Sequence, residues 1–237
     1  MSKPFRFKHF SVEQARCAMK IGTDAVLLGA WADLEAQPNS VLDIGAGTGI
    51  LALMMAQRSD AKLIDALEID DAAYEQCVEN FENSDWGDRL FCYHAALDEF
   101  TDEIEDQYDL IISNPPFYTD TFKTENEERN TARFEDAMPF DTLLQSVSEL
   151  LSKSGQFNVV LPYSEESTFI KLAEKKGLFP CRILNVRGQQ SSSIKRSLIC
   201  FTFQKKAIKT TYLTIEITRH HYTKEYLSLT KDFYLKL

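Results

Sequence analysis

Val41-Leu42-Asp43-Ile44-Gly45-Ala46-Gly47-Thr48-Gly49 is a short apolar strand that closes in a glycine loop. Residues 50–57 follow without a helix breaker, so the loop joins a strand to a helix. Glycines at such a junction allow a tight turn and let a ligand approach the backbone closely. The stretch therefore predicts an α/β fold with a ligand site at the end of its first core strand.

Strand and helix patterns alternate along the rest of the chain. Apolar runs predict strands at 62–68, 90–94, 108–112, 156–161, 183–186 and 197–204, with a weaker edge strand at 212–217. Amphipathic or breaker-free segments predict helices at 50–57, 71–83, 140–151 and 167–176, with Gly155 ending the third of these. This alternation is typical of one doubly wound, mostly parallel α/β sheet.

The bulk composition indicates a single soluble globular domain over residues 1–237. We divide it into an N-terminal segment with a helix over the cofactor site (1–36), a catalytic core (37–205) and a C-terminal extension (206–237). The chain has no apolar run long enough to span a membrane and no signal-peptide core, so we expect a cytoplasmic protein without a membrane partner. Its five scattered cysteines form no C-x-x-C pair, so we expect no metal site.

The glycine loop favours a cationic ligand over a dinucleotide. Its pattern is G-x-G-x-G, and Ile50 stands where the dinucleotide fingerprint needs a small residue. Asp43 at the start of the loop would repel a pyrophosphate but suits the amine and sulfonium of S-adenosyl-L-methionine. Glu68, at the end of the next strand, is placed to accept hydrogen bonds from ribose hydroxyls, although it could instead be a helix N-terminal acid.

Asn114-Pro115-Pro116-Phe117 follows the apolar run at 110–112. Two prolines stiffen the turn and remove two backbone donors, which leaves carbonyls free to accept. The side-chain oxygen of Asn114 adds a second acceptor, and Phe117 adds a ring face. An ordinary Asn-Pro turn is the simpler interpretation of the dipeptide alone. Together with the glycine loop, however, the string predicts a holder for a planar amine.

Charge is distributed unevenly along the chain. From Lys153 onward there are 15 Lys and Arg against 6 Asp and Glu, whereas residues 1–152 hold 11 against 30. Residues 98–109 carry seven acids and no base, which we interpret as a solvated loop. The basic C-terminal third suggests a polyanionic partner on one side, although surface lysines that merely keep a domain soluble would give the same count.

The loop, the acid and the Asn-Pro-Pro-Phe turn together resemble class I methyltransferases that modify planar nitrogens. Over nearly the whole chain the sequence is similar to a bacterial family that methylates adenine-37 of valine tRNA. The resemblance rests on both motifs and on Phe7-Lys8-His9-Phe10, Gln14, the run from Gly22 to Trp31, Thr131-Ala132-Arg133, Val160-Leu161-Pro162, Tyr222 to Tyr226, and Phe233-Tyr234-Leu235. It implies a Rossmann-like, seven-stranded mixed sheet with helices on both faces, its antiparallel strand supplied by 197–204.

The resemblance also implies the roles of individual residues. The cofactor-binding candidates are Lys20, Thr23, Asp43, Gly45, Ala46, Gly47, Gly49, Glu68, Ile69, Ala96, Leu97 and Asn114. Asn114, Pro115 and Phe117 are the catalytic candidates. Thr23 is also a candidate N-cap of a core helix over 22–31. The family often has an acid where this chain has Ala96, so either a backbone amide near Ala96 and Leu97 contacts the adenine or Asp98 reaches round.

Three hypotheses for function follow. The first is transfer of a methyl group to the N6 amine of adenine in tRNA by a monomer, with Arg133, Lys195 and Arg196 gripping phosphates. The second is methylation of glutamine N5 in a protein, which the short N-terminal segment and the basic C-terminal third disfavour. The third is a non-catalytic cofactor-fold module, which the intact Asn114 and Phe117 disfavour. A DNA substrate is disfavoured because no segment is long enough for a target-recognition domain.

Overall fold

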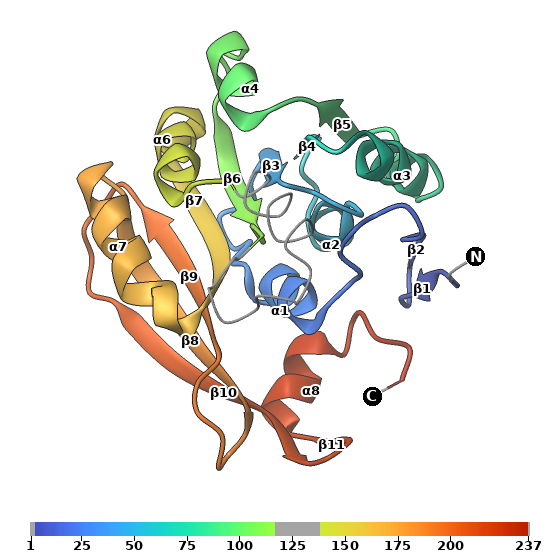
Figure 1. Cartoon of the computed structure of the whole chain (residues 1–237), viewed down its shortest axis with the longest axis vertical. Coiled ribbons are helices and arrows are strands. Elements are labelled where there is room, and N and C mark those ends of the chain that lie inside the picture. The colour runs from blue at the N-terminus through green and yellow to red at the C-terminus, as the bar shows by residue number, and fades with distance from the viewer. Residues whose placement is uncertain (1–2, 117–137, 237) are drawn as a thin grey trace, which may run out of the picture.

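The computed structural model describes residues 3–116 and 138–236 of the chain (Figure 1). Its centre is a nine-stranded sheet in the order β11-β10-β8-β9-β7-β6-β3-β4-β5. The strands are β3 (Ser40–Ile44), β4 (Leu63–Glu68), β5 (Leu90–His94), β6 (Tyr108–Ser113), β7 (Leu151–Pro162), β8 (Phe179–Gln189), β9 (Arg196–Thr202), β10 (Lys209–Thr218) and β11 (His221–Tyr222). A separate two-stranded sheet consists of β1 (Phe5–Arg6) and β2 (Ser11–Val12).

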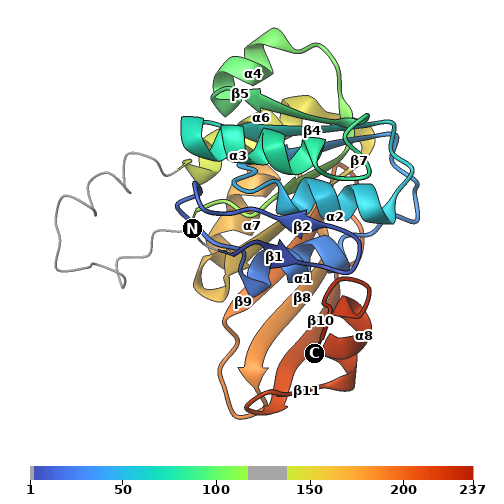
Figure 2. The same ribbon diagram turned by 90° about the vertical axis from the view of Figure 1, so that its right-hand side faces the viewer.

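Helices cover both faces of the large sheet (Figures 1 and 2). One apolar core takes side chains from α1 (Thr23–Trp31), α2 (Ile50–Arg58), α3 (Asp71–Glu82) and α8 (Lys224–Thr230). The other takes side chains from α4 (Leu97–Glu103), α6 (Phe140–Leu150) and α7 (Glu166–Lys175), which follows the short 3-10 turn η2 (Tyr163–Glu165). Within the described ranges, no helix is long and apolar enough to cross a bilayer.

The central strand β3 shows why both faces are covered. Its side chains alternate: Val41 packs in the α1–α2 core, whereas Leu42 and Ile44 pack in the α4–α6 core. All three are fully buried, so a slip of one residue would exchange the two apolar sets. β3 pairs in parallel with β4 on one side and β6 on the other. The carboxyl ends of these three strands therefore lie at the same edge of the sheet.

The doubly wound fold and its inserted strand are confirmed. β9, predicted at 197–204, runs antiparallel between β7 and β8. The strand count of seven is wrong, because β10 pairs in parallel with β8 and β11 folds back on β10. The buried Leu213 of β10 packs in the same core as Tyr226 of α8. The C-terminal residues thus pair with β8, which would otherwise be an open lateral strand of the sheet.

Three local predictions are corrected. The third predicted helix ends at Leu150, one residue before its predicted end, but Gly155 does not end it: β7 begins at Leu151 with a shift in its register against β6, and Gly155 lies within that strand. Residues 98–109 are only partly a loop, since Leu97 and Phe100 bury one side of α4 while its acids stay exposed. The N-cap of α1 is Gly22 in place of Thr23, which is already the first helical residue.

Candidate functional site

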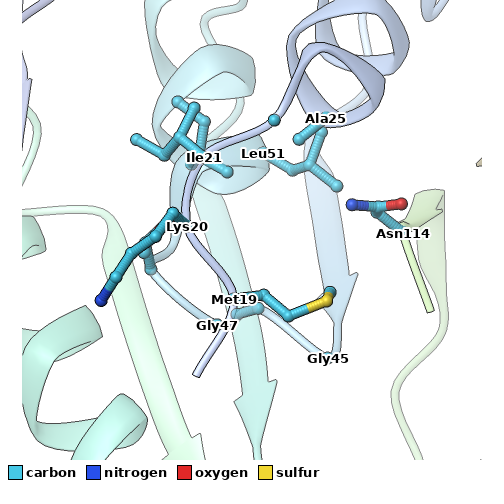
Figure 3. A pocket seen from close by; sticks show the side chains of 12 residues that line it. Met19, Lys20, Ile21, Ala25, Gly45, Gly47, Leu51 and Asn114 are labelled. Atoms are coloured by element: carbon cyan, nitrogen blue, oxygen red, sulfur yellow. The ribbon is translucent and has the colours of Figure 1, made fainter. Parts of the chain in front are cut away.

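A pocket opens where β3 and β6 end and α1 and α2 begin (Figure 3). Its lining comes from three stretches of the chain and from Asn114. The lining residues are Met19, Lys20, Ile21, Gly22, Ala25, Gly45, Ala46, Gly47, Thr48, Ile50, Leu51 and Asn114. The pocket thus brings the predicted glycine loop and the predicted catalytic amide to one place, although 69 residues separate Gly45 from Asn114.

The glycines of the loop differ in what they face. Gly45 and Gly47 have φ of +74° and +56°, and a Cβ on either would meet no atom within 4 Å. Both positions therefore need glycine for their backbone conformation, and both leave open space on the pocket side. Gly49 has φ of +76°, but a Cβ there would lie 2.5 Å from Cε1 of Phe81 and 2.8 Å from Sγ of Cys77. The structure therefore gives Gly49 a packing contact with α3, and Gly49 does not line the pocket.

Asp43 lies in β3, two residues before Gly45; it is fully buried and does not itself line the pocket. Its Oδ2 accepts a hydrogen bond of 3.1 Å from the backbone N–H of Ala52 in the first turn of α2. Its Oδ1 has no hydrogen-bond partner among the described residues. Burial raises the pKa of Asp43 to about 7; the hydrogen bond from Ala52 opposes this rise, and the charge of Glu68 adds to it. An unpaired buried carboxylate oxygen next to an open glycine loop fits a cationic ligand in the pocket.

Glu68 holds the glycine loop in place. Its Oε2 accepts a hydrogen bond of 2.7 Å from Gly47 N–H, and its Oε1 accepts bonds of 2.9 Å from the N–H groups of Ile69 and Asp70. These contacts tie the end of β4 to the loop after β3. Ile69 next to it is 65% exposed, so it offers an apolar surface at the same edge of the sheet.

The residues predicted to contact the adenine end lie at the start of α4. Ala96 is the N-cap of this helix and is half-buried. The Leu97 side chain is buried in the α4–α6 core, so a contact with adenine would have to come from its backbone. Asp98 is exposed in the first turn of α4. The backbone amide and the Asp98 carboxylate therefore both remain open as adenine contacts.

The predicted N-terminal contacts differ from one another in the structure. Lys20 lines the pocket, but its ammonium donates to the carbonyls of Gln14, Ala15 and Cys17 and points away from Asn114 (Figure 3). Thr23 is exposed and does not line the pocket. Gly22 and Ala25, which flank it in the chain, line the pocket in its place.

Asn114 follows β6 at the rim of the pocket, where its amide nitrogen points toward Ala25 and Leu51 and its oxygen points away from them (Figure 3). Its position is fixed by the preceding Ser113, whose buried hydroxyl donates a 2.8 Å bond to the carbonyl of Ile44 on β3. Pro115 is buried directly after it. Phe117 lies outside the described residues.

The predicted phosphate contacts are in three different situations. Arg196 forms an ion pair of 2.7 Å with Asp24 of α1, and its Nη1 donates to the carbonyl of Lys195. The side chain of Lys195 is exposed. Arg133 lies outside the described residues. Among the residues that the structure describes, no three His, Cys, Asp or Glu side chains are grouped to hold a metal ion.

Asn80 is a site-supporting residue that the sequence reasoning missed. This buried side chain of α3 donates bonds of 2.9 Å to the carbonyls of Glu13 and Thr48, and its Oδ1 accepts a 2.8 Å bond from Glu13 N–H. One amide thus joins the N-terminal strap (residues 13–22) to the glycine loop. An asparagine inside an amphipathic helix was the only signal in the sequence, and it does not reveal partners 32 and 67 residues away.

Replacing Asn80 with alanine is expected to weaken cofactor binding by about tenfold and to destabilise the fold by roughly 2–4 kcal/mol, because two carbonyls lose a buried donor. Isothermal titration with the cofactor and thermal melts measure the two effects. Glu82→Ala, at an exposed position on the same helix, is the matched control. Equal cofactor affinity in Asn80→Ala and wild type would show that the strap does not help to shape the pocket.

Comparison with protein families agrees with this geometry. The family model named methyltransferase small domain matches residues 20–167. Among solved structures, a predicted O-methyltransferase from Agrobacterium tumefaciens superposes with a TM-score of 0.67 at 18% identity, over 89% of this chain and 96% of that one. A ribosomal protein L11 methylase from Lactobacillus delbrueckii subsp. bulgaricus has a TM-score of 0.54 at 16% identity, over 77% of each chain. At these identities the superpositions support the fold alone.

Curated relatives match over the full length. A protein of Christiangramia forsetii named tRNA1(Val) (adenine(37)-N6)-methyltransferase is 60% identical over 100% of this chain and 99% of its own. Proteins with the same name from Flavobacterium psychrophilum and Bacteroides fragilis are 56% and 45% identical. These alignments cover 98% and 100% of this chain, and all of each relative.

Proposed function

Because the chain belongs to the family of tRNA1(Val) (adenine(37)-N6)-methyltransferases, we propose that it methylates the N6 amine of adenine-37 in valine tRNA, with S-adenosyl-L-methionine as donor. The observation that carries the proposal is the position of Asn114 at the rim of a glycine-lined pocket. A tRNA substrate places the reaction in the cytoplasm. In this proposal the protein acts as a monomer.

The residues of the pocket are suited to the cofactor. The open faces of Gly45 and Gly47 leave room for its methionine end, and the buried carboxylate of Asp43 favours a cation there. We assign Glu68 to accept from the ribose hydroxyls, with lone pairs that remain beside the backbone N–H groups that both of its oxygens already accept from. Ile69 offers an apolar surface to the adenine ring. When bound, the cofactor supplies an electrophilic methyl group on a positively charged sulfur.

The protein's contribution to the reaction is to orient the target amine. Its lone pair is delocalised into the adenine ring, which makes it a poor nucleophile. We assign the Asn114 side-chain oxygen and the Pro115 carbonyl as acceptors of its two N–H groups, which directs the lone pair toward the methyl group. Phe117 is assigned to stack on the base. As the nitrogen–carbon bond forms, the bond between the methyl group and sulfur breaks and its electron pair stays on sulfur, while one of the two amine protons leaves to water.

Incubation with labelled S-adenosylmethionine tests the proposal. Valine tRNA from a strain that lacks this modification and a release factor with an unmethylated glutamine are offered separately. We expect label in N6-methyladenine, at position 37, in the tRNA arm only. Label in methylglutamine would support the protein-directed alternative instead. No label in either reaction would support a binding module without catalytic activity.

A further inference from the structure

The topology brings several loops to the same edge of the sheet as Asn114. The strands β6, β7, β8 and β10 are parallel, so their carboxyl ends share one edge with the amino ends of the antiparallel β9 and β11. This edge therefore carries Asn114, the η2 turn, the β8–β9 connection and the β10–β11 turn, in the order of the strands. Residues 203–208, which join β9 to β10, lie at the opposite edge.

The two sides of the pocket differ in charge. Residues 70–109, which form α3, β5 and α4, hold 14 acidic residues and one basic residue, Arg89. Residues 186–196 and 217–224 hold five basic residues and no acidic one, with Glu216 and Glu225 flanking the second stretch. Both ribbon views place α4 and the β10–β11 turn at opposite ends of the molecule (Figures 1 and 2). Phosphates are therefore repelled on the α4 side and attracted on the β11 side.

Not every basic residue at this edge is free for a ligand. Arg196 is paired with Asp24, so its charge is already balanced. Arg187 donates a 2.9 Å bond from Nε to Thr214 and a further bond to Gln190, which orients its guanidinium at the carboxyl end of β8. Lys195 and Arg219 are exposed in the β8–β9 connection and the β10–β11 turn, and Lys224, also exposed, begins α8 directly after the short β11.

An exposed aromatic ring lies on the path between Asn114 and these cations. Tyr163 begins the η2 turn after β7 and is 43% exposed. Its N–H donates a 3.1 Å bond to the carbonyl of Lys195, which ties the ring's backbone to the β8–β9 connection. An aromatic ring beside a lysine is a typical contact for an unstacked base and its phosphate.

We propose that the protein has an arm-binding surface, which binds the anticodon arm of the substrate tRNA where it extends from the pocket away from α4. This surface consists of Tyr163, Arg187, Lys195, Arg219 and Lys224. This inference rests on the proposed function, because it takes the substrate to be tRNA. Adenine-37 at Asn114 then places the neighbouring anticodon-loop nucleotides over Tyr163 and Lys195. The phosphates of the stem lie over the β8–β9 connection and the β10–β11 turn.

Charge reversal at the two edges of the sheet tests the surface. The double variant Arg219→Glu/Lys224→Glu changes the net charge by four at the arm-binding surface, and Lys205→Glu/Lys206→Glu changes it equally at the opposite edge. All four side chains are exposed. Binding of fluorescently labelled valine tRNA is measured directly by anisotropy at several salt concentrations, together with KM and kcat for methylation and the Kd of the cofactor.

We expect the Arg219→Glu/Lys224→Glu variant to bind tRNA at least about tenfold more weakly at 0.1 M salt and to show a shallower salt dependence, by roughly 0.7 in the log–log slope for each lost phosphate contact. Its KM for tRNA rises in parallel, whereas its kcat and its affinity for the cofactor stay near wild type. The Lys205→Glu/Lys206→Glu variant binds within about twofold of wild type. Tyr163→Ala is expected to raise KM for tRNA without changing the salt slope, as loss of stacking predicts.

Equal losses in the two double variants, or no loss in the first, would overturn the arm-binding surface. Because binding is measured directly, this result does not depend on turnover. Wild-type protein that binds tRNA through this surface but methylates none of it would contradict the proposed function and leave the surface intact. If wild-type protein methylates tRNA and both double variants are unimpaired, the proposed function stands and the arm-binding surface is contradicted.

Discussion

Replacing Asn114 with alanine is expected to lower kcat for tRNA methylation by about 10³-fold while the Kd of S-adenosylmethionine changes by less than about threefold. The physical reason is that the side chain lines the pocket at the end of a strand, where we propose that it accepts a hydrogen bond from the target amine. We assign cofactor binding to other groups, namely the glycine loop, which lines the pocket, and Asp43 and Glu68, which lie next to that loop. Removing the amide therefore affects the reacting geometry more than donor binding. Single-turnover kinetics with saturating tRNA, and isothermal titration with the cofactor, measure the two effects.

Two further variants at this position separate orientation from simple loss of volume. Asn114→Asp keeps an acceptor oxygen at the same distance from the backbone, so it is expected to retain more activity than Asn114→Ala. Asn114→Gln keeps the amide but moves it by one methylene, and a displacement of about 1 Å is enough to cost roughly 10²-fold in rate. Wild-type turnover in Asn114→Ala would end the proposed mechanism.

Asp43→Asn is expected to weaken cofactor binding at pH 8 by more than about tenfold and, in the same protein, to raise the melting temperature. The first effect follows from the loss of a buried negative charge next to a pocket for a cation. The second follows because burial raises the pKa of Asp43 to about 7 in the folded protein. Above pH 7, keeping that carboxylate ionised lowers the free energy of unfolding by on the order of 4 kcal/mol. The neutral amide of the Asp43→Asn variant avoids this cost, and its buried N–H groups without partners offset only part of the gain.

The sign of the pH dependence follows from the raised pKa. Protonated Asp43 is favoured in the folded state, so its contribution to stability is complete below the unfolded value of 3.8 and is lost as pH rises toward about 7. The gain in melting temperature from Asp43→Asn is therefore expected at pH 8 and should be much smaller at pH 5. Thermal melts at the two pH values measure it. An equal gain at both would show that the carboxylate is not held neutral.

Cofactor affinity gives an independent measurement of the same group. Wild-type Kd is expected to rise as pH falls from 8 to 6, by up to about tenfold, because the carboxylate that attracts the cation becomes protonated. The Asp43→Asn variant has no such group, so its own pH profile corrects for titration of the cofactor's amine and carboxylate. Parallel profiles for the two proteins would remove Asp43 as the source of the attraction.

The parts of the site that could be predicted from sequence are those that depend on neighbouring residues. A glycine loop after an apolar strand and an Asn-Pro-Pro turn after another are local patterns, and parallel pairing of β3 with β6 brings their ends together. Contacts across the chain could not be predicted in this way. Gly49 faces α3 instead of the pocket, and Asn80 joins two segments far from it in sequence. Neither contact has a period or a motif that a single sequence displays.

The distribution of charge likewise separates what the sequence predicts from what the tertiary structure determines. The sequence by itself determined that the C-terminal third is basic, and that strands and helices alternate so that the loops bearing the chemistry end at one edge of a sheet. Only the tertiary structure decided which of those charges face that edge. Strand direction sends Lys205 and Lys206 to the far edge, and Arg196 is neutralised by an aspartate 172 residues away. Composition counts charges, whereas a partner responds to their positions in space, which are set by strand order and by contacts distant in the chain.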